Sequence, residues 1–265
     1  MMDDAVTADA LLNGRVRLYQ PARGARMSLD SVLLASFVAP PFGRFLDIGC
    51  GTGPISFLLL ARDPAAAGVG VEIQSRLAAL AARGRDENGW ETRLEIIDGD
   101  VRALGDRLGE GTFDLVVTNP PYRTVDSSPP SPNQEKALAY NEIALRLAEW
   151  VAVAARVVRP GGRVAAILPM VRSTELTSAM VRRGLRPVRI RHVQAYPDLP
   201  ASRILLEVKQ GPELWLNVEP PLVVHDAGGG FTPEVRRMLG ETVETGEALD
   251  APALGQGVGV STKAR

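Results

Sequence analysis

The chain has 265 residues, 45% hydrophobic and 23% charged, proportions typical of a globular protein with one large α/β domain or one domain with appendages. No apolar run reaches the roughly 20 residues of a membrane helix, and the single cysteine, Cys50, excludes an internal disulfide and a multi-cysteine zinc site. The net charge of −1 identifies no partner, and we expect a cytoplasmic protein without metal or membrane contact, either monomer or homodimer.

Short apolar runs alternate with helix-like segments from residue 44 onward. Before them, a mixed segment at 11–30 precedes a short helix predicted at 31–39, which Pro40 and Pro41 close. The alternation predicts βαβ units, and hence a mostly parallel sheet with helices on both faces. Strands are predicted at 45–48, 69–72, 93–97, 113–118 and 163–168, and helices at 54–62, 75–84, 135–158 and 173–183.

Two later strands, predicted at 188–193 and 204–208, have no helix between them. We expect them to pair as an antiparallel hairpin at one edge of the sheet. The predicted fold is therefore a Rossmann-like, doubly wound α/β fold with a mostly parallel seven-stranded sheet. A short helix is predicted to begin at Pro233, with Thr232 as its N-cap.

A glycine-rich turn joins the strand at 45–48 to the helix that follows. It contains Asp47, Gly49, Cys50, Gly51 and Gly53, and its glycines lack the Cβ atoms that would keep a ligand from the backbone. The GxGxG spacing differs from the GxGxxG of dinucleotide-binding folds, and an acid before the first glycine would repel a pyrophosphate. That acid suits the sulfonium and ammonium groups of S-adenosylmethionine better, whereas a tight turn without a ligand is the alternative.

Acidic side chains follow the next two strands. Glu72 ends one strand, where its two oxygens can accept hydrogen bonds from ribose hydroxyls, and Asp100 follows the other, where it can accept from an adenine amino group. Each acid alone could be a solvated loop carboxylate. Together at successive strand ends they predict a nucleoside cofactor, with the neighbouring Ile73 and Val101 in the same site.

The strand at 113–118 ends in Asn119, Pro120, Pro121 and Tyr122. Both prolines favour extended backbone in the preceding residue and offer no N–H, which makes a stiff corner rich in acceptors. The Asn119 side-chain oxygen and the Pro120 carbonyl can accept from one planar amine and turn its lone pair toward an incoming methyl group. Because Tyr122 can stack on the group that carries the amine, Asn119, Pro120 and Tyr122 are the predicted catalytic residues, and Asn119 is also predicted to contact the cofactor. A proline-bounded loop with a buried asparagine is the alternative.

With these motifs the chain resembles the class I, S-adenosylmethionine-dependent amino-methyltransferases with an Asn-Pro-Pro-Tyr motif. Within that group it is most similar to the bacterial tRNA1(Val) (adenine-37-N6)-methyltransferases, through Gln20, Pro21, Arg26 and residues 28–34, and again through 220–226 and 231–234. Phe231, where many relatives have tyrosine, and the last residues depart from the family pattern. The resemblance implies S-adenosylmethionine as cofactor and N6-methylation of adenosine 37 in valine tRNA.

The resemblance also implies how the chain is organised. An N-terminal segment (1–43) would flank the cofactor site, and residues 44–240 would form the Rossmann-like methyltransferase domain with a C-terminal extension. Residues 241–265 lack periodicity and carry few large apolar side chains, so their composition predicts a disordered tail. Asp30, in the first of these parts, would help to hold the methionine end of the cofactor. Its alternative role is to cap the helix at 31–39.

A protein that binds tRNA needs cations near the amine corner. Arg189 and Arg191 share one face of a predicted strand, Arg203 follows in the hairpin, and Arg123 comes directly after Tyr122. These four arginines are predicted to contact RNA, and a solvated charged face is the alternative.

Other functions stay open at this level. An N5-glutamine methyltransferase acting on a protein usually carries a helical N-terminal domain, for which the residues before the first strand leave no room. An enzyme acting on adenine N6 or guanine N2 of DNA or rRNA is a second alternative, although DNA enzymes normally add a target-recognition domain. An RNA-binding module without catalysis is the non-enzyme alternative, and it would have no use for the corner at Asn119.

Overall fold

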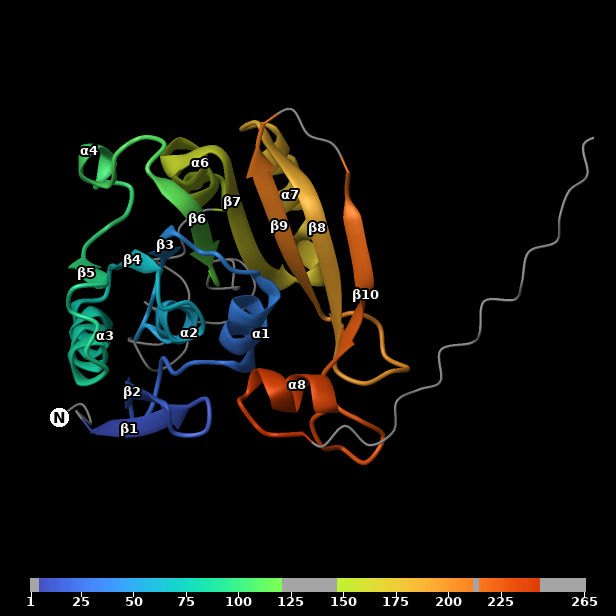
Figure 1. Cartoon of the computed structure of the whole chain (residues 1–265). Helices are drawn as coiled ribbons and strands as arrows, with labels where there is room; N and C mark the ends of the chain where they lie inside the picture. The colour runs from blue at the N-terminus through green and yellow to red at the C-terminus, as the bar shows by residue number, and fades with distance from the viewer. Residues whose placement is uncertain (1–4, 121–146, 212–214, 244–265) are drawn as a thin grey trace, which may run out of the picture.

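An eight-stranded sheet forms the centre of the molecule in the computed structural model, which describes residues 5–120, 147–211 and 215–243 (Figure 1). The strand order is β10-β8-β9-β7-β6-β3-β4-β5. Strand β9 is antiparallel to its neighbours β7 and β8, and the other adjacent pairs are parallel. The strands are β3 (Arg44–Ile48), β4 (Ala67–Glu72), β5 (Leu94–Asp98), β6 (Phe113–Thr118), β7 (Val158–Pro169), β8 (Leu185–Gln194), β9 (Arg203–Gln210) and β10 (Asn217–Val223).

The predicted α/β class and the antiparallel β8–β9 hairpin are confirmed, but the strand count and the position of the hairpin are wrong. The sheet has eight strands rather than seven, and the hairpin does not form the edge, because β10 pairs in parallel with β8 beyond it. Strand β10 contains Pro220 and Pro221, which cannot donate to a ladder and therefore argue against a strand. An edge strand tolerates them, and its register with β8 shifts between Glu219 and Leu222, where the prolines lie.

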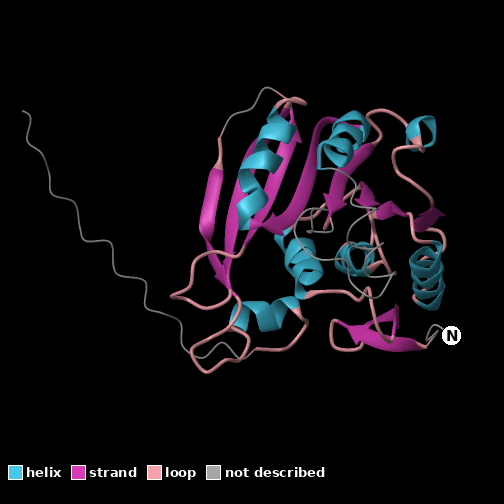
Figure 2. Ribbon diagram, turned by 180° about the vertical axis from the view of Figure 1, so that it is seen from behind, coloured by secondary structure: helices cyan, strands magenta, loops and turns pink. Residues whose placement is uncertain are grey.

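Helices cover both faces of the sheet, as expected for a doubly wound fold (Figure 2). Alternate residues of β6 face the two layers of helices: Leu115 and Val117 pack with α1 and α2, whereas Val116 packs with α6 and α7. Of the helix predicted at 135–158, the structure describes the part from Leu147, and the preceding residues lie outside the described ranges. The helices are α1 (Leu29–Phe37), α2 (Pro54–Arg62), α3 (Ser75–Glu87), α4 (Gly105–Leu108), α6 (Leu147–Val157), α7 (Ser173–Val181) and α8 (Pro233–Met238), with a 3₁₀ turn at Met170–Arg172.

Strands β1 (Val6–Leu11) and β2 (Val16–Pro21) form a separate antiparallel hairpin that the sequence pattern did not reveal. Its turn places Leu12 and Asn13 at positive φ, and β2 buries Val16 and Leu18 in the core beside α2 and α3. The exposure of β1 alternates, but half of its residues are small or acidic, so no strong apolar period marks it.

The end of the described chain agrees with one further prediction. Helix α8 begins at Pro233, and the Thr232 hydroxyl accepts a hydrogen bond from the Val235 N–H at 3.5 Å, which confirms the predicted cap. Most of the predicted tail at 241–265 lies outside the described residues. In the described part of the chain, none of the helices has the length and apolar character needed to cross a membrane.

Candidate functional site

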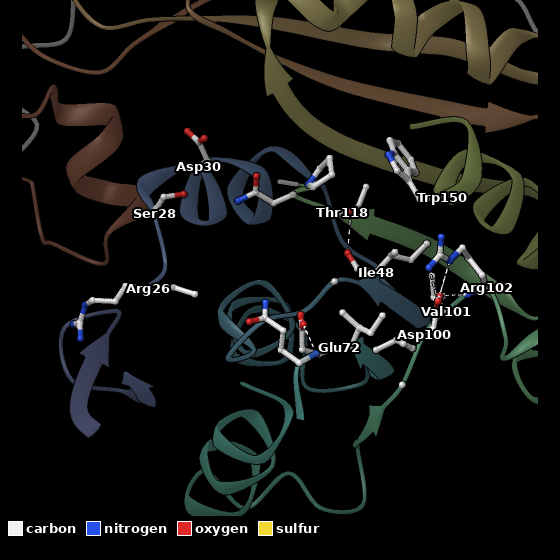
Figure 3. Close-up of a pocket in the computed structure, with 18 of the residues that line it drawn as sticks. Arg26, Ser28, Asp30, Ile48, Glu72, Asp100, Val101, Arg102, Thr118 and Trp150 are labelled. Carbon is white, nitrogen blue, oxygen red and sulfur yellow. Dashed lines mark hydrogen bonds and ion pairs between the residues drawn. The ribbon is translucent and has the colours of Figure 1, made fainter. Parts of the chain in front are cut away.

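A cavity of about 440 Å³ opens at the carboxyl ends of β3, β4, β5 and β6 (Figure 3). It brings together most of the side chains that the motifs singled out, because parallel strands end at one edge of the sheet. The predicted residues that line it are Asp30, Gly49, Glu72, Ile73, Asp100, Val101, Asn119, Pro120 and Arg203. A smaller cavity of about 150 Å³ continues along Gly49, Cys50 and Gly51 and also touches Asn119.

The backbone conformation of the glycine-rich turn explains why glycine occupies three of its positions. Gly49, Gly51 and Gly53 have φ of 71°, 57° and 91°, values that only glycine adopts readily. A Cβ at Gly49 or Gly51 would meet no atom within 4 Å, so crowding within the protein does not explain these two glycines. The prediction placed Gly53 beside the cofactor, but Gly53 lines neither cavity, and a Cβ there would lie 2.8 Å from the Phe57 ring.

Glu72 supports the turn and faces the large cavity at the same time. Its Oε2 accepts from the Gly51 N–H at 2.9 Å, and its Oε1 accepts from the Gln74 N–H at 2.9 Å. Burial raises the pKa of this carboxyl, and these backbone donors oppose the shift. Because each carboxylate oxygen has a second acceptor site, Glu72 can still accept from ligand hydroxyls.

Asp47 does not lie where the motif placed it, since it lines neither cavity and is fully buried. Its Oδ2 accepts from the Ser56 hydroxyl at 2.7 Å and from the Ser56 N–H at 3.2 Å, in the first turn of α2. Burial raises the pKa of Asp47 to about 7, with a smaller contribution from the charge of Glu72. The structure therefore does not support the expected direct contact of Asp47 with a cofactor. In β3, Ile48 lines the large cavity while Asp47 points to the opposite face, which the period of two could have indicated.

Asp100 carries a partner that the motif analysis missed. Arg102 donates to it from Nε at 2.9 and 3.0 Å and from Nη2 at 2.6 Å, and also to Glu149 at 3.2 Å. The hydrogen bonds from Arg102 lower the pKa of Asp100 despite partial burial. Arg102 and Trp150 both line the large cavity (Figure 3). The position of Arg102, two residues after Asp100, could have indicated that it belongs to the site. Trp150 reaches the cavity from α6, far along the chain, so its position in the sequence gave no such indication.

Asn119 stands at the junction of the two cavities. The strand end before it is held by Thr118, whose buried hydroxyl donates to the Ile48 carbonyl at 2.9 Å. The Asn119 side-chain Nδ2 donates to the Ser31 hydroxyl of α1 at 3.4 Å. Pro121, Tyr122 and Arg123 lie outside the described residues, so their predicted roles stay predictions.

Comparison with known proteins decides the class of protein to which this site belongs. Residues 26–168 match the model of the methyltransferase small domain family. The chain belongs to this methyltransferase family. It is also 30% identical over 234 residues to a tRNA1(Val) (adenine(37)-N6)-methyltransferase from Porphyromonas gingivalis, a match that covers 84% of this chain and 91% of the relative. A relative of the same name from Bacteroides fragilis is 29% identical over 182 residues, 68% of this chain and 76% of that one.

Solved structures agree with this assignment. A predicted O-methyltransferase from Agrobacterium tumefaciens superimposes with a TM-score of 0.64 at 25% identity, over 79% of this chain and 94% of the other. A geranyl diphosphate methyltransferase in complex with SAM shares the fold, with a TM-score of 0.50 at 15% identity over 68% of this chain and 84% of that one. The predicted Rossmann-like methyltransferase fold is thus confirmed.

The N-terminal segment of the methyltransferase contributes one wall of the cavity through Ala25, Arg26, Ser28 and Asp30. Ser28 occupies the N-cap position of α1, so the alternative in which Asp30 caps this helix is wrong. Asp30 instead accepts from Arg203 Nε at 3.1 Å. The prediction assigned these two residues to cofactor and RNA respectively, whereas the structure pairs them with each other at the cavity wall.

Arg189 and Arg191 lie away from the cavity of the methyltransferase. They share one strand face, as predicted, since both approach Glu219, at 3.5 and 3.8 Å. Arg189 also lies over the Phe37 ring at 4.0 Å, and Arg191 forms two hydrogen bonds to Glu234 at 2.6 and 2.9 Å. Their side chains are only 20% and 15% exposed. This arrangement joins β8, β10 and α8 and does not favour the predicted contact with RNA.

Metal ligands are a further question for the site. Among the residues that the structure describes, no three histidine, cysteine, aspartate or glutamate side chains gather as a metal site would require.

Proposed function

We propose that this methyltransferase transfers a methyl group from S-adenosylmethionine to N6 of an adenosine in tRNA, the anticodon-loop adenosine 37 of valine tRNA. The names of the relatives from Porphyromonas gingivalis and Bacteroides fragilis support the substrate. The observation that carries the proposal is the cavity itself, in which Glu72 and Asp100 share a wall with Asn119 and Pro120. A tRNA substrate would place the protein in the cytoplasm.

The residues of the cavity suit the parts of S-adenosylmethionine. Glu72 and Asp100 offer carboxylate acceptors at the ends of neighbouring strands, where ribose hydroxyls and an adenine amino group need them. Ile73 and Val101 supply apolar contacts next to these acceptors, and the glycine turn offers open backbone along the smaller cavity. We assign Asp30, Gly49, Cys50 and Gly51 to the remainder of the cofactor. When bound, the sulfonium of this cofactor supplies an electrophilic methyl group.

The protein's own contribution to methyl transfer is alignment of the target amine. The Asn119 Oδ1 and the Pro120 carbonyl would accept one hydrogen bond each from the two N–H groups of adenine N6. Both bonds favour the geometry in which the nitrogen lone pair leaves conjugation with the base and points toward the incoming methyl group. No general base is needed before the transfer, because the amine attacks as a neutral nucleophile and loses its proton afterwards. We propose Tyr122 as the stacking surface for the base and Arg123 as a contact to RNA.

The test uses the whole protein and two kinds of substrate. Isotopically labelled S-adenosylmethionine is incubated with unmodified total tRNA or with a protein extract, and the nucleosides and peptides are examined by mass spectrometry. We expect labelled N6-methyladenosine in the tRNA fraction. A valine tRNA transcript with uridine in place of adenosine 37 should accept no label.

Two outcomes would overturn the proposal. Labelled glutamine in the protein fraction would identify a protein methyltransferase. Labelled N2-methylguanosine would keep the reaction class but change the base.

A further inference from the structure

Helix α1 contributes to the reactive corner a polar side chain to which the sequence analysis assigned no role. Ser31 lies in its first turn, is 3% exposed and lines the smaller cavity together with Asn119. Its hydroxyl oxygen accepts a hydrogen bond from the Asn119 Nδ2 at 3.4 Å. We propose that Ser31 is a positioning residue, which orients the Asn119 amide so that its oxygen faces the target amine.

The argument depends on the two ends of a side-chain amide. One end is an acceptor oxygen and the other a donor NH₂ group, and rotation by 180° exchanges them at little steric cost. The target amine of the proposed reaction is a donor, so only the orientation with Oδ1 toward the substrate can hold it. A hydroxyl can accept from Nδ2 or donate to Oδ1, and in the structure the Ser31 hydroxyl accepts from Nδ2. This contact therefore holds the amide, before the substrate arrives, in the orientation that directs Oδ1 away from Ser31.

Packing and an ion pair hold Ser31 in its position. The residues that follow it in α1, Val32, Leu33 and Leu34, are at most 3% exposed and belong to the core. The same turn of the helix is tied to the start of β9 by the ion pair of Asp30 with Arg203, at 3.1 Å. On the other side, the Thr118 hydroxyl holds the end of β6 to β3. Donor and acceptor thus approach each other from two rigid elements, which reduces the entropy lost on orienting the amide.

The experiment compares single-turnover methylation rates at saturating cofactor and tRNA. Ser31→Ala should lower the rate between about 10-fold and 100-fold, the size of effect expected from a misplaced polar contact. Ser31→Thr keeps the hydroxyl and should retain most of the rate. Ser178→Ala removes a serine hydroxyl from α7, away from both cavities, and serves as the matched control. Equilibrium affinities for cofactor and tRNA, measured for all three variants, separate a loss of rate from a loss of binding.

A double variant separates positioning from a general structural effect. If Ser31 acts through the Asn119 amide, Ser31→Ala should cause no further loss in an Asn119→Ala background. Equal losses in the presence and absence of the amide would overturn the proposal. So would a wild-type rate in Ser31→Ala, or a rate loss that a weaker affinity for the cofactor explains.

A second readout needs no substrate, so it still holds if the proposed function fails. The side-chain NH₂ signals of Asn119 can be assigned in nitrogen-15 NMR spectra as the pair that disappears in Asn119→Ala. Ser31→Ala should shift this pair, and Ser178→Ala should leave it in place. An unchanged pair in Ser31→Ala would contradict the contact itself, whereas absence of methyl transfer to tRNA by the wild-type protein would contradict only the proposed function.

Discussion

The two halves of the sheet use charged side chains in different ways. In the half built from β3, β4 and β5, the carboxylates of Glu72 and Asp100 stand at strand ends and line the large cavity. In the half built from β8, β9 and β10, charged side chains lie within the strands and pair with one another, as Arg189 does with Glu207 at 3.4 Å. A charge within a covered strand needs a partner from the protein, whereas a charge at a strand end can be shared with a ligand.

This difference explains why one set of predictions located the cavity and another did not. The order of strands and the position of a residue at a strand end identified the half built from β3, β4 and β5, which we call the cofactor half. A run of arginines identified only charge, and the carboxylate to which Arg191 donates two hydrogen bonds, Glu234, comes from α8, more than 40 residues along the chain. Asp47 is the exception in the cofactor half, since it stands beside the glycine turn but lies buried against Ser56.

The largest expected effect concerns Asp47. Burial raises the pKa of Asp47 from 3.8 to about 7, so the folded protein binds this proton more tightly than the unfolded chain does. The stability that this group contributes is present below pH about 4 and is lost as the pH rises toward about 7, in total about 4 kcal/mol. Asp47→Asn removes the titration, and we expect a flatter dependence of the free energy of unfolding on pH. Denaturant unfolding across this pH range measures it, and parallel curves for variant and wild type would show that Asp47 is not buried in this way.

Asn119→Ala changes the residue that follows β6, which lies between the two halves of the sheet. The loss of one preorganised acceptor on the target amine should lower the single-turnover rate by about 10² to 10³. Cofactor affinity should change little, because the carboxylate contacts proposed for the cofactor, Glu72 and Asp100, stand at the ends of β4 and β5 and stay in place. A variant that methylates at the wild-type rate would mean that another group holds the amine.

Glu72→Gln tests the cofactor half directly. One amide NH₂ would face backbone donors that now bind a carboxylate, and the acceptor strength offered to the ribose would fall. We expect the binding of S-adenosylmethionine to weaken by about 1.5–3 kcal/mol, measured by titration calorimetry. Glu219→Gln makes the same chemical change in β10 and should leave the affinity unaltered. Equal effects of both changes would remove the distinction between the two halves.

Arg191→Ala should have the smallest effect, and on stability rather than on binding. The variant loses the two hydrogen bonds to Glu234, a carboxylate that is 41% exposed, and exposure reduces the expected loss to about 1 kcal/mol. Thermal unfolding measures this, with the exposed Arg186 replaced by alanine as control. If Arg191→Ala instead raises the Michaelis constant for tRNA and flattens its salt dependence, the predicted RNA contact is right.

Local signals were enough for much of the central fold. The bounds of α2 and β6 agree with the prediction at both ends, because a proline at the first helical position begins α2 and a compact apolar run forms β6. Strand β10 was not predicted because its two prolines argue against a strand, although an edge strand tolerates them. The β1–β2 hairpin was not predicted because the residues of β1 show no strong alternation of apolar and polar side chains. In both cases tertiary pairing outweighs a weak local preference.

The sequence by itself determined the class of fold, the order of the motifs and the edge at which they meet, since parallel strands connected by helices all end on one side. Only the tertiary structure decided which polar groups at that edge face the cavity. Glu72 reaches it, Asp47 turns to Ser56, and Asp30 pairs with Arg203 from a strand more than 170 residues away. The reason is that a buried charge or amide takes the partner that packing brings to it, and that partner can come from any part of the chain.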